Sequence, residues 1–101
     1  MTYQLVLQLP ANSVEDYDEL VALENDLIAN CKPGDEVDGH DFGQGEANIF
    51  VITEQPELAF RTFQQVLAGN PRWKEVRAAF RKLDGSEYTA IWPKGARFRI
   101  K

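Results

Sequence analysis

The chain begins with an alternation of apolar and polar positions. Over residues 2–9 the odd positions are apolar and the even positions are polar, with Val6 as the exception. A period of two residues is typical of a strand with one buried face. Pro10 cannot donate a ladder hydrogen bond, so this strand is predicted to end there.

The pattern then changes to the three- and four-residue spacing of an amphipathic helix. Ser13 followed by Asp16 resembles a capping box, which predicts a helix start. The helix is predicted to run to about Asn30, because Lys32, Pro33 and Gly34 follow. Its buried stripe is predicted to consist of Tyr17, Leu20, Val21, Leu27 and Ile28.

Two further strands and a second helix are predicted next. Residues 36–42 indicate a short, irregular strand, and residues 43–45 turn the chain into residues 47–53. The continuous apolar run of this last segment is typical of a central strand covered on both sides. Pro56 suits the first turn of a helix, which residues 69–71 end. The buried stripe of this second helix is predicted to consist of Ala59, Phe63, Val66 and Leu67.

The C-terminal third is less clearly patterned. Residues 73–83 fit either a strand or a short helix, and the alternation that follows Asp84-Gly85 up to Trp92 favours a hairpin. Residues 96–101 are a candidate for a last edge segment. The order β-α-β-β-α-β with a C-terminal β extension predicts one α+β domain over residues 1–101. We expect a ferredoxin-like two-layer sandwich, with both helices on one face of an antiparallel sheet.

Composition narrows the class of protein. A hydrophobic content of 44% places the chain among globular domains rather than disordered ones. The single cysteine, Cys31, fits a reducing compartment and is expected to be an inert, partly buried thiol. The first residues do not resemble a signal peptide, and no apolar run is long enough to span a bilayer. We therefore expect a cytoplasmic protein without a membrane partner.

Charge is distributed unevenly along the chain. Residues 1–60 hold 13 acids against one base, and residues 61–101 hold 10 bases against three acids, giving −12 and +7. The two halves either complement each other in the fold or present an acidic surface to a basic partner. Arg97, Arg99 and Lys101 alternate with apolar residues, as in a nucleic-acid footprint. The acidic half would repel a polyanion, so nucleic acid is not expected as a partner.

The residues most able to carry chemistry lie in one turn, and they allow three interpretations. A metal could bind at Asp38, His40 and Glu46, although an extended strand would place Asp38 and His40 on one face and Asp41 on the other. His40 could instead serve a small-molecule site in a dimeric sheet protein. The third interpretation is that the glycines supply only bend and bulge geometry. No known catalytic motif is present, so we expect no catalytic residue, no metal and no cofactor.

The turn and strand DGHDFGQGEANIF resemble those of a group of small bacterial proteins. The resemblance extends over roughly residues 2–70, including the opening TYQLVLQLP, the helix EDYDELVALENDLI, and Thr53 with Pro56 before the second helix. Some such sequences carry a general transporter-ATPase label, which the absence of a phosphate-loop motif does not support here. The resemblance supports the fold and implies no activity. It implies that one set of turn residues acts as a unit: Asp38, His40, Asp41, Gly43, Gly45 and Glu46.

These observations favour a non-enzymatic protein–protein interaction module of a regulatory, adaptor or immunity-like kind. Phe50 or Ile52 must face away from the helices, which makes the far face of the sheet partly apolar. Such a face either mediates self-association as a homodimer or is covered by the C-terminal extension. The alternatives are a ferredoxin-like dimer that uses His40 and a weak metal-binding domain at the turn.

Overall fold

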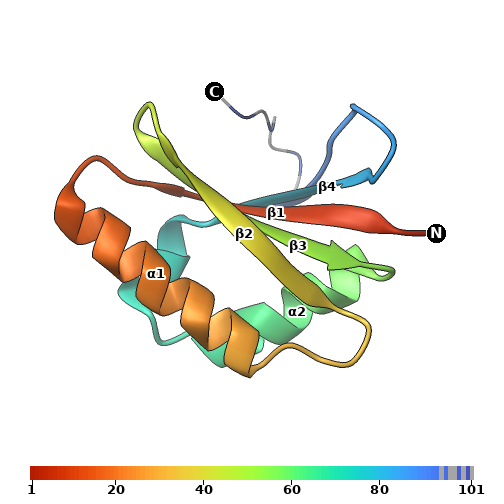
Figure 1. Ribbon diagram of the computed structural model, residues 1–101, viewed down its shortest axis with the longest axis horizontal. Helices are drawn as coiled ribbons and strands as arrows, with labels where there is room; N and C mark the ends of the chain where they lie inside the picture. The colour runs from red at the N-terminus through yellow and green to blue at the C-terminus, as the bar shows by residue number, and fades with distance from the viewer. Residues whose placement is uncertain (94, 96–97, 99, 101) are drawn as a thin grey trace.

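A computed structural model describes residues 1–93, 95, 98 and 100. In this part of the chain, a five-stranded antiparallel sheet carries two helices on one face (Figure 1). The elements follow in the order β1 (Tyr3–Pro10), α1 (Val14–Ala29), β2 (Glu36–Gly43), β3 (Glu46–Thr53), α2 (Pro56–Leu67), a 3-10 helix (Pro71–Glu75), β4 (Arg77–Lys82) and β5 (Thr89–Trp92). The predicted α+β class and the placement of both helices on one face are confirmed.

The strand order is β2-β3-β1-β4-β5, so β2 and β5 form the two edges. The central strand β1 places Val6 opposite Phe50 on β3 and Ala79 on β4. The hairpin predicted in the C-terminal third is confirmed, because β4 and β5 pair antiparallel. The segment that had fitted either a strand or a helix contains both, since the 3-10 helix precedes β4.

The core lies between the sheet and the helices. Leu5, Leu7 and Leu9 of β1 point into it, together with Ile49 and Val51 of β3. Alternation of side chains along each strand leaves Val6, Phe50 and Ile52 on the far face, as expected.

The buried stripe of α1 differs from the predicted one. Leu20, Leu23 and Leu27 are buried, whereas Tyr17 is 39% and Ile28 55% exposed. The predicted set combined two neighbouring rows of the helix and omitted Leu23. The row of leucines faces the core because these side chains are spaced by three and four residues.

The stripe of α2 requires a similar correction. Phe60, which the prediction omitted, is buried, and Val66 is 45% exposed. The buried row runs through Ala59, Phe60 and Phe63 and gains cover from the 3-10 helix. There the ring of Trp73 stacks on Phe60 with 5.9 Å between ring centroids.

Side-chain hydrogen bonds fix the start of α1 and the turn that leads into α2. The backbone N–H of Asp16 donates to Ser13 Oγ at 3.1 Å, and Asp16 Oδ2 accepts from the backbone N–H of Asn12 at 2.7 Å. This confirms the predicted capping arrangement with one difference. In a capping box the Asp16 side chain would accept from the N–H of the N-cap residue Ser13, whereas here it accepts from the preceding residue, Asn12. Before α2, Thr53 Oγ1 accepts from the backbone N–H of Gln55 and donates to Asp35 Oδ1 at 2.6 Å.

The far face of the sheet is not bare. Val6 and Ala79 point away from the helices, yet both are completely buried by the chain itself. Phe98 and Ile100 are half-buried outside any strand, and the ring of Phe98 lies 5.2 Å from that of Tyr88. The remainder of the edge segment expected over residues 96–101 lies outside the described residues. No helix in the described part of the chain has the length and apolar character needed to cross a membrane.

Candidate functional site

The predicted turn is a two-residue hairpin loop between β2 and β3. Gly43 pairs with Glu46, and the two loop residues have positive backbone angles, φ 54° at Gln44 and 82° at Gly45. Positive φ at both loop positions is the geometry of a type I′ turn, which matches the twist of the flanking strands. The carbonyl of Gly45 also accepts from the backbone N–H of Ala11 at 3.1 Å. Gly45 therefore supplies the positive φ angle that the turn requires.

A β-bulge interrupts β2 near the start of the predicted site. Val37 pairs with Val51 on the core side, whereas Gly39, with φ 138°, pairs with Phe50 on the far face. The bulge removes Asp38 from the ladder, so the expected sharing of one face by Asp38 and His40 does not follow. Beyond the bulge, regular alternation resumes.

His40 faces α1 and is bound to it. His40 Nδ1 lies 3.1 Å from both carboxylate oxygens of Glu24, and the two side chains are 26% and 14% exposed. The ring of Tyr17 contacts His40 edge-on at 5.7 Å and Phe42 at 5.4 Å. The histidine thus joins the edge strand to the helix beside it.

Glu46 belongs to a different cluster, on the far face of the sheet. Glu46 Oε2 accepts hydrogen bonds from Gln8 Nε2 and Asn48 Nδ2, each at 3.1 Å. Gln8 Nε2 also donates to Asn48 Oδ1 at 3.1 Å. All three side chains are buried, and Asn48 is only 1% exposed. Buried polar groups of this kind are stable only when they are hydrogen-bonded.

The six predicted residues therefore do not form one cluster. His40 is directed toward α1, Asp41 and Glu46 lie on the opposite face, and the two glycines shape the turn. Among the described residues, no three His, Cys, Asp or Glu side chains are grouped closely enough to hold a metal ion.

Four partners of these residues were missed by the sequence-based prediction. Tyr17 and Glu24 are seven positions apart on α1, a spacing that places them on one face of the helix. Asn48 follows Glu46 by two positions on β3, and Gln8 lies opposite Asn48 on β1. The helical spacing and the strand alternation were visible in the sequence, but the pairing of distant segments was not.

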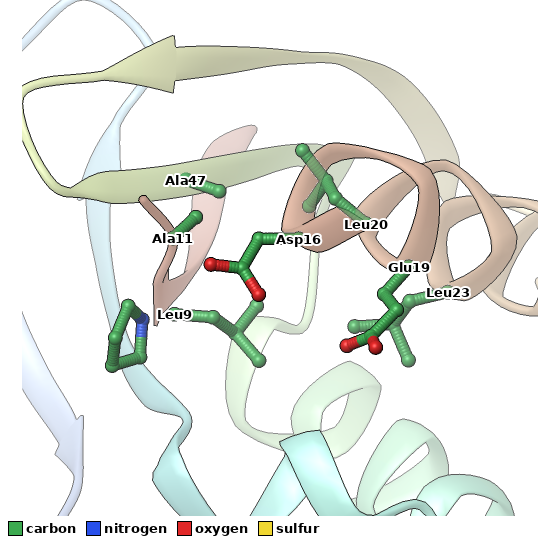
Figure 2. Close-up of a pocket in the computed structure, with 8 residues that line it drawn as sticks. Leu9, Ala11, Asp16, Glu19, Leu20, Leu23 and Ala47 are labelled. Atoms are coloured by element: carbon green, nitrogen blue, oxygen red, sulfur yellow. The ribbon is translucent and has the colours of Figure 1, made fainter. Parts of the chain in front are cut away.

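A small cavity beside Ala47 of β3 does not suit a substrate. It has a volume of about 20 Å³ and lies between the end of β1 and α1, with Leu9, Ala11 and Ala47 in its wall (Figure 2). Asp16 and Glu19 of α1 add carboxylates to a mainly apolar lining. This volume holds about one water molecule. A larger, open hollow of about 460 Å³ is lined by Glu19, Ala22, Asn70, Pro71 and Glu75.

Cys31 lies just after α1 and is half-buried. Burial raises the pKa of its thiol, and the negative charges of Asp35 and Glu36 act in the same direction. A backbone hydrogen bond at Val37 partly opposes this effect. A raised pKa keeps the thiol protonated at neutral pH, which makes it a poor nucleophile.

The most distinctive surface of the molecule is acidic and lies where α1 runs beside β2. We call it the α1–β2 surface. It includes the exposed carboxylates Glu15 and Asp18 of α1 and Glu36, Asp38 and Asp41 of the edge strand β2, with Asp41 on the face of β2 turned away from α1. None of these five forms an ion pair with a cation among the described side chains. The ion pair found in the described part of the chain, His40–Glu24, joins two residues of the acidic half. Asp16, Glu19 and Glu46 of the same half have further polar or electrostatic partners, and the complementation expected between the two halves stays a prediction.

Comparison with known proteins identifies no relative of this chain. The chain matches no family model, no curated protein and no solved structure.

Proposed function

We propose that this protein is a non-enzymatic protein-binding module and that its α1–β2 surface binds a basic region of a partner. The observation that carries the proposal is the set of five exposed carboxylates without a cation among the described side chains. Uncompensated charge of one sign on a folded surface raises the rate at which an oppositely charged partner associates.

The polar residues of the turn support binding rather than catalysis. A general base needs access to a substrate proton, and a nucleophile needs a base within hydrogen-bond reach. His40 Nδ1 is directed at Glu24, Glu46 is buried with Gln8 and Asn48, and the pKa of Cys31 is raised. The alternatives with His40 as a catalytic or ligand-binding group, or with a metal at the turn, gain no comparable support.

The sheet arrangement supports a ferredoxin-like assignment of the first four strands as part of the same proposal. β3 separates β1 from β2, and β1 separates β3 from β4, as in a split βαβ arrangement. β5 is then an addition at one edge. Ferredoxin-like domains host many unrelated functions, so this assignment adds nothing to the choice of partner.

Capture from a lysate of the native host tests the proposal. We would immobilise the wild-type protein beside two variants that each lose two negative charges: Asp38→Asn with Asp41→Asn on the α1–β2 surface, and Asp84→Asn with Glu87→Gln in the β4–β5 connection. A partner should be retained by the wild type and the second variant, lost by the first, and eluted by moderate salt. A partner retained equally by all three proteins would contradict the assignment to the α1–β2 surface.

A further inference from the structure

We infer that the segment recognised by the α1–β2 surface is a basic, extended peptide that adds to β2 as a further strand. This inference rests on the proposed function and specifies the partner's chemistry and its mode of binding. Three features of the described residues carry it: an open strand edge, an apolar row on the neighbouring helix, and the carboxylates around both.

The first feature is the open edge of β2. Glu36–Gly43 is the terminal strand of the sheet and pairs with β3 on one side only. The other side of an edge strand presents unpaired backbone N–H and C=O groups, which can accept an additional strand. The bulge at Asp38–Gly39 breaks regular pairing, so the regular part available to a partner is residues 40–43.

The second feature is a row of side chains along α1. Val14, Tyr17, Val21, Glu24 and Ile28 are spaced by three, four, three and four residues, which places them in one line on the helix. Two members fix the direction of this line, because Tyr17 contacts Phe42 and Glu24 contacts His40, both on β2.

The apolar members of this row lack complete cover. Val14 is 78% exposed, Ile28 is 55% exposed and Val21 is half-buried. A strand added to β2 would lie about 4.8 Å beyond it, and alternate side chains of that strand would face the helix layer. Apolar residues at every second position of the peptide would therefore contact this row.

The third feature, charge, selects a basic peptide over a second copy of the chain. Glu36, Asp38 and Asp41 lie on the edge strand itself, with Asp18 on the helix beside it. Pairing β2 with β2 of another copy would bring these carboxylates together, and like charges across a strand pair are destabilising. Arginine or lysine between the apolar positions of a peptide would instead neutralise them.

The probe for this inference is a fluorescent peptide of alternating arginine and valine, RVRVRV. Its control has the same side chains but carries an N-methyl group on every residue, which removes the N–H groups of both peptide edges. Binding is measured by fluorescence anisotropy, and amide hydrogen exchange is followed by NMR at residues 40–43.

We expect the unmodified peptide to bind at least about tenfold more tightly than its N-methylated control, a ratio that corresponds to about 1.4 kcal/mol. The outward amides of residues 40–43 should exchange more slowly in the complex. The Asp38→Asn, Asp41→Asn variant should bind both peptides more weakly than the Asp84→Asn, Glu87→Gln variant does.

Each other outcome overturns the inference in a distinguishable way. Equal binding of the two peptides would leave charge attraction without strand addition, which is compatible with the proposed function alone. Equal binding by the two protein variants would show that the peptide does not bind at the α1–β2 surface, and it would contradict the proposed function as well. Protection of residues 40–43 that grows with protein concentration in the absence of peptide would show that a second copy is the occupant.

Discussion

Glu24 is a half-buried carboxylate whose hydrogen-bond partner is the chain's one histidine, 3.1 Å away. Removing either partner leaves a polar group with reduced access to water, and such a group destabilises the folded state. The two residues are 16 positions apart, so their contact fixes the position of α1 against β2.

A double-mutant cycle with His40→Ala and Glu24→Ala should therefore give a coupling free energy of about 1 kcal/mol. Urea unfolding supplies the free energies of unfolding, and Glu24→Gln, which keeps an acceptor oxygen, is the milder control. Additive effects of the two substitutions would show that the contact does not stabilise the folded state.

Cys31 provides a second test at the scale of a residue. Because burial and the neighbouring carboxylates raise the pKa of its thiol, a disulfide reagent should react more slowly with the folded than with the unfolded chain at pH 8. A folded chain that reacts as fast as the unfolded one would contradict the raised pKa.

The same pKa shift predicts how stability depends on pH. The folded chain holds the thiol proton more tightly than the unfolded chain, so stability falls as pH rises from the unfolded pKa, about 8.5, through the higher folded value. Cys31→Ser should remove this part of the pH dependence. Identical profiles for the wild type and this variant would argue against the shift.

At the scale of residues, the sequence indicated which side chains of the turn are polar and unusual, but it did not indicate which side chains they contact. The residues of the turn stood out because histidine, carboxylates and glycines occur together over a few positions. Their partners on α1 and β1 lie up to 38 positions away. Only the folded register places Gln8 next to Asn48, and no local pattern contains that information.

At the scale of elements, the helix α1 carries two neighbouring rows of apolar side chains, one packed in the core and one exposed beside β2. Leu20, Leu23 and Leu27 fill the core, and the row through Tyr17 and Ile28 lies beside the edge strand. Apolar residues occur in both rows, so the hydrophobic pattern alone did not distinguish buried from exposed positions. The capping residues, in contrast, were predictable because they act within four residues of one another.

Two alanine substitutions distinguish the buried row of α1 from its exposed row. Leu23→Ala should lower the free energy of unfolding by roughly 2–4 kcal/mol, because it leaves a cavity in the core. Ile28→Ala, on a side chain that is more than half exposed, should lower it by less than about 1 kcal/mol. Chemical denaturation measures both, and equal losses would contradict the assignment of the rows.

The β2–β3 hairpin shows how far turn chemistry could be predicted. The pair Gln44-Gly45 forms a type I′ loop even though glutamine is not a preferred residue at its first position. The glycine-rich sequence indicated the turn and the bend. Bulge geometry at the glycines was one of the three interpretations of the turn, and the register shift between Val37 and Gly39 agrees with it. Its effect on the direction of Asp38 was not predictable, because a one-residue register shift depends on the partner strand.

At the scale of the whole molecule, the unequal distribution of charge along the sequence persists in the fold. The two acidic elements α1 and β2 are neighbours, and the exposed acids Glu15, Asp18, Glu36, Asp38 and Asp41 form no ion pair with a described base. The sequence showed the imbalance between the halves, but only the packing of α1 beside β2 shows that two acidic segments are neighbours in the fold.

The described side chains leave the charge of the α1–β2 surface uncompensated, and this statement is central to the proposed function. It is tested most directly by unfolding the two charge-matched variants at low salt, about 10 mM, where screening extends over about 30 Å, and again at about 1 M. Removing Asp38 and Asp41 should raise stability at low salt through relief of repulsion. This gain should largely disappear at high salt and be smaller in the Asp84→Asn, Glu87→Gln variant. A loss of stability on neutralising Asp38 and Asp41 would mean that these carboxylates have stabilising partners within the chain, and it would contradict the account.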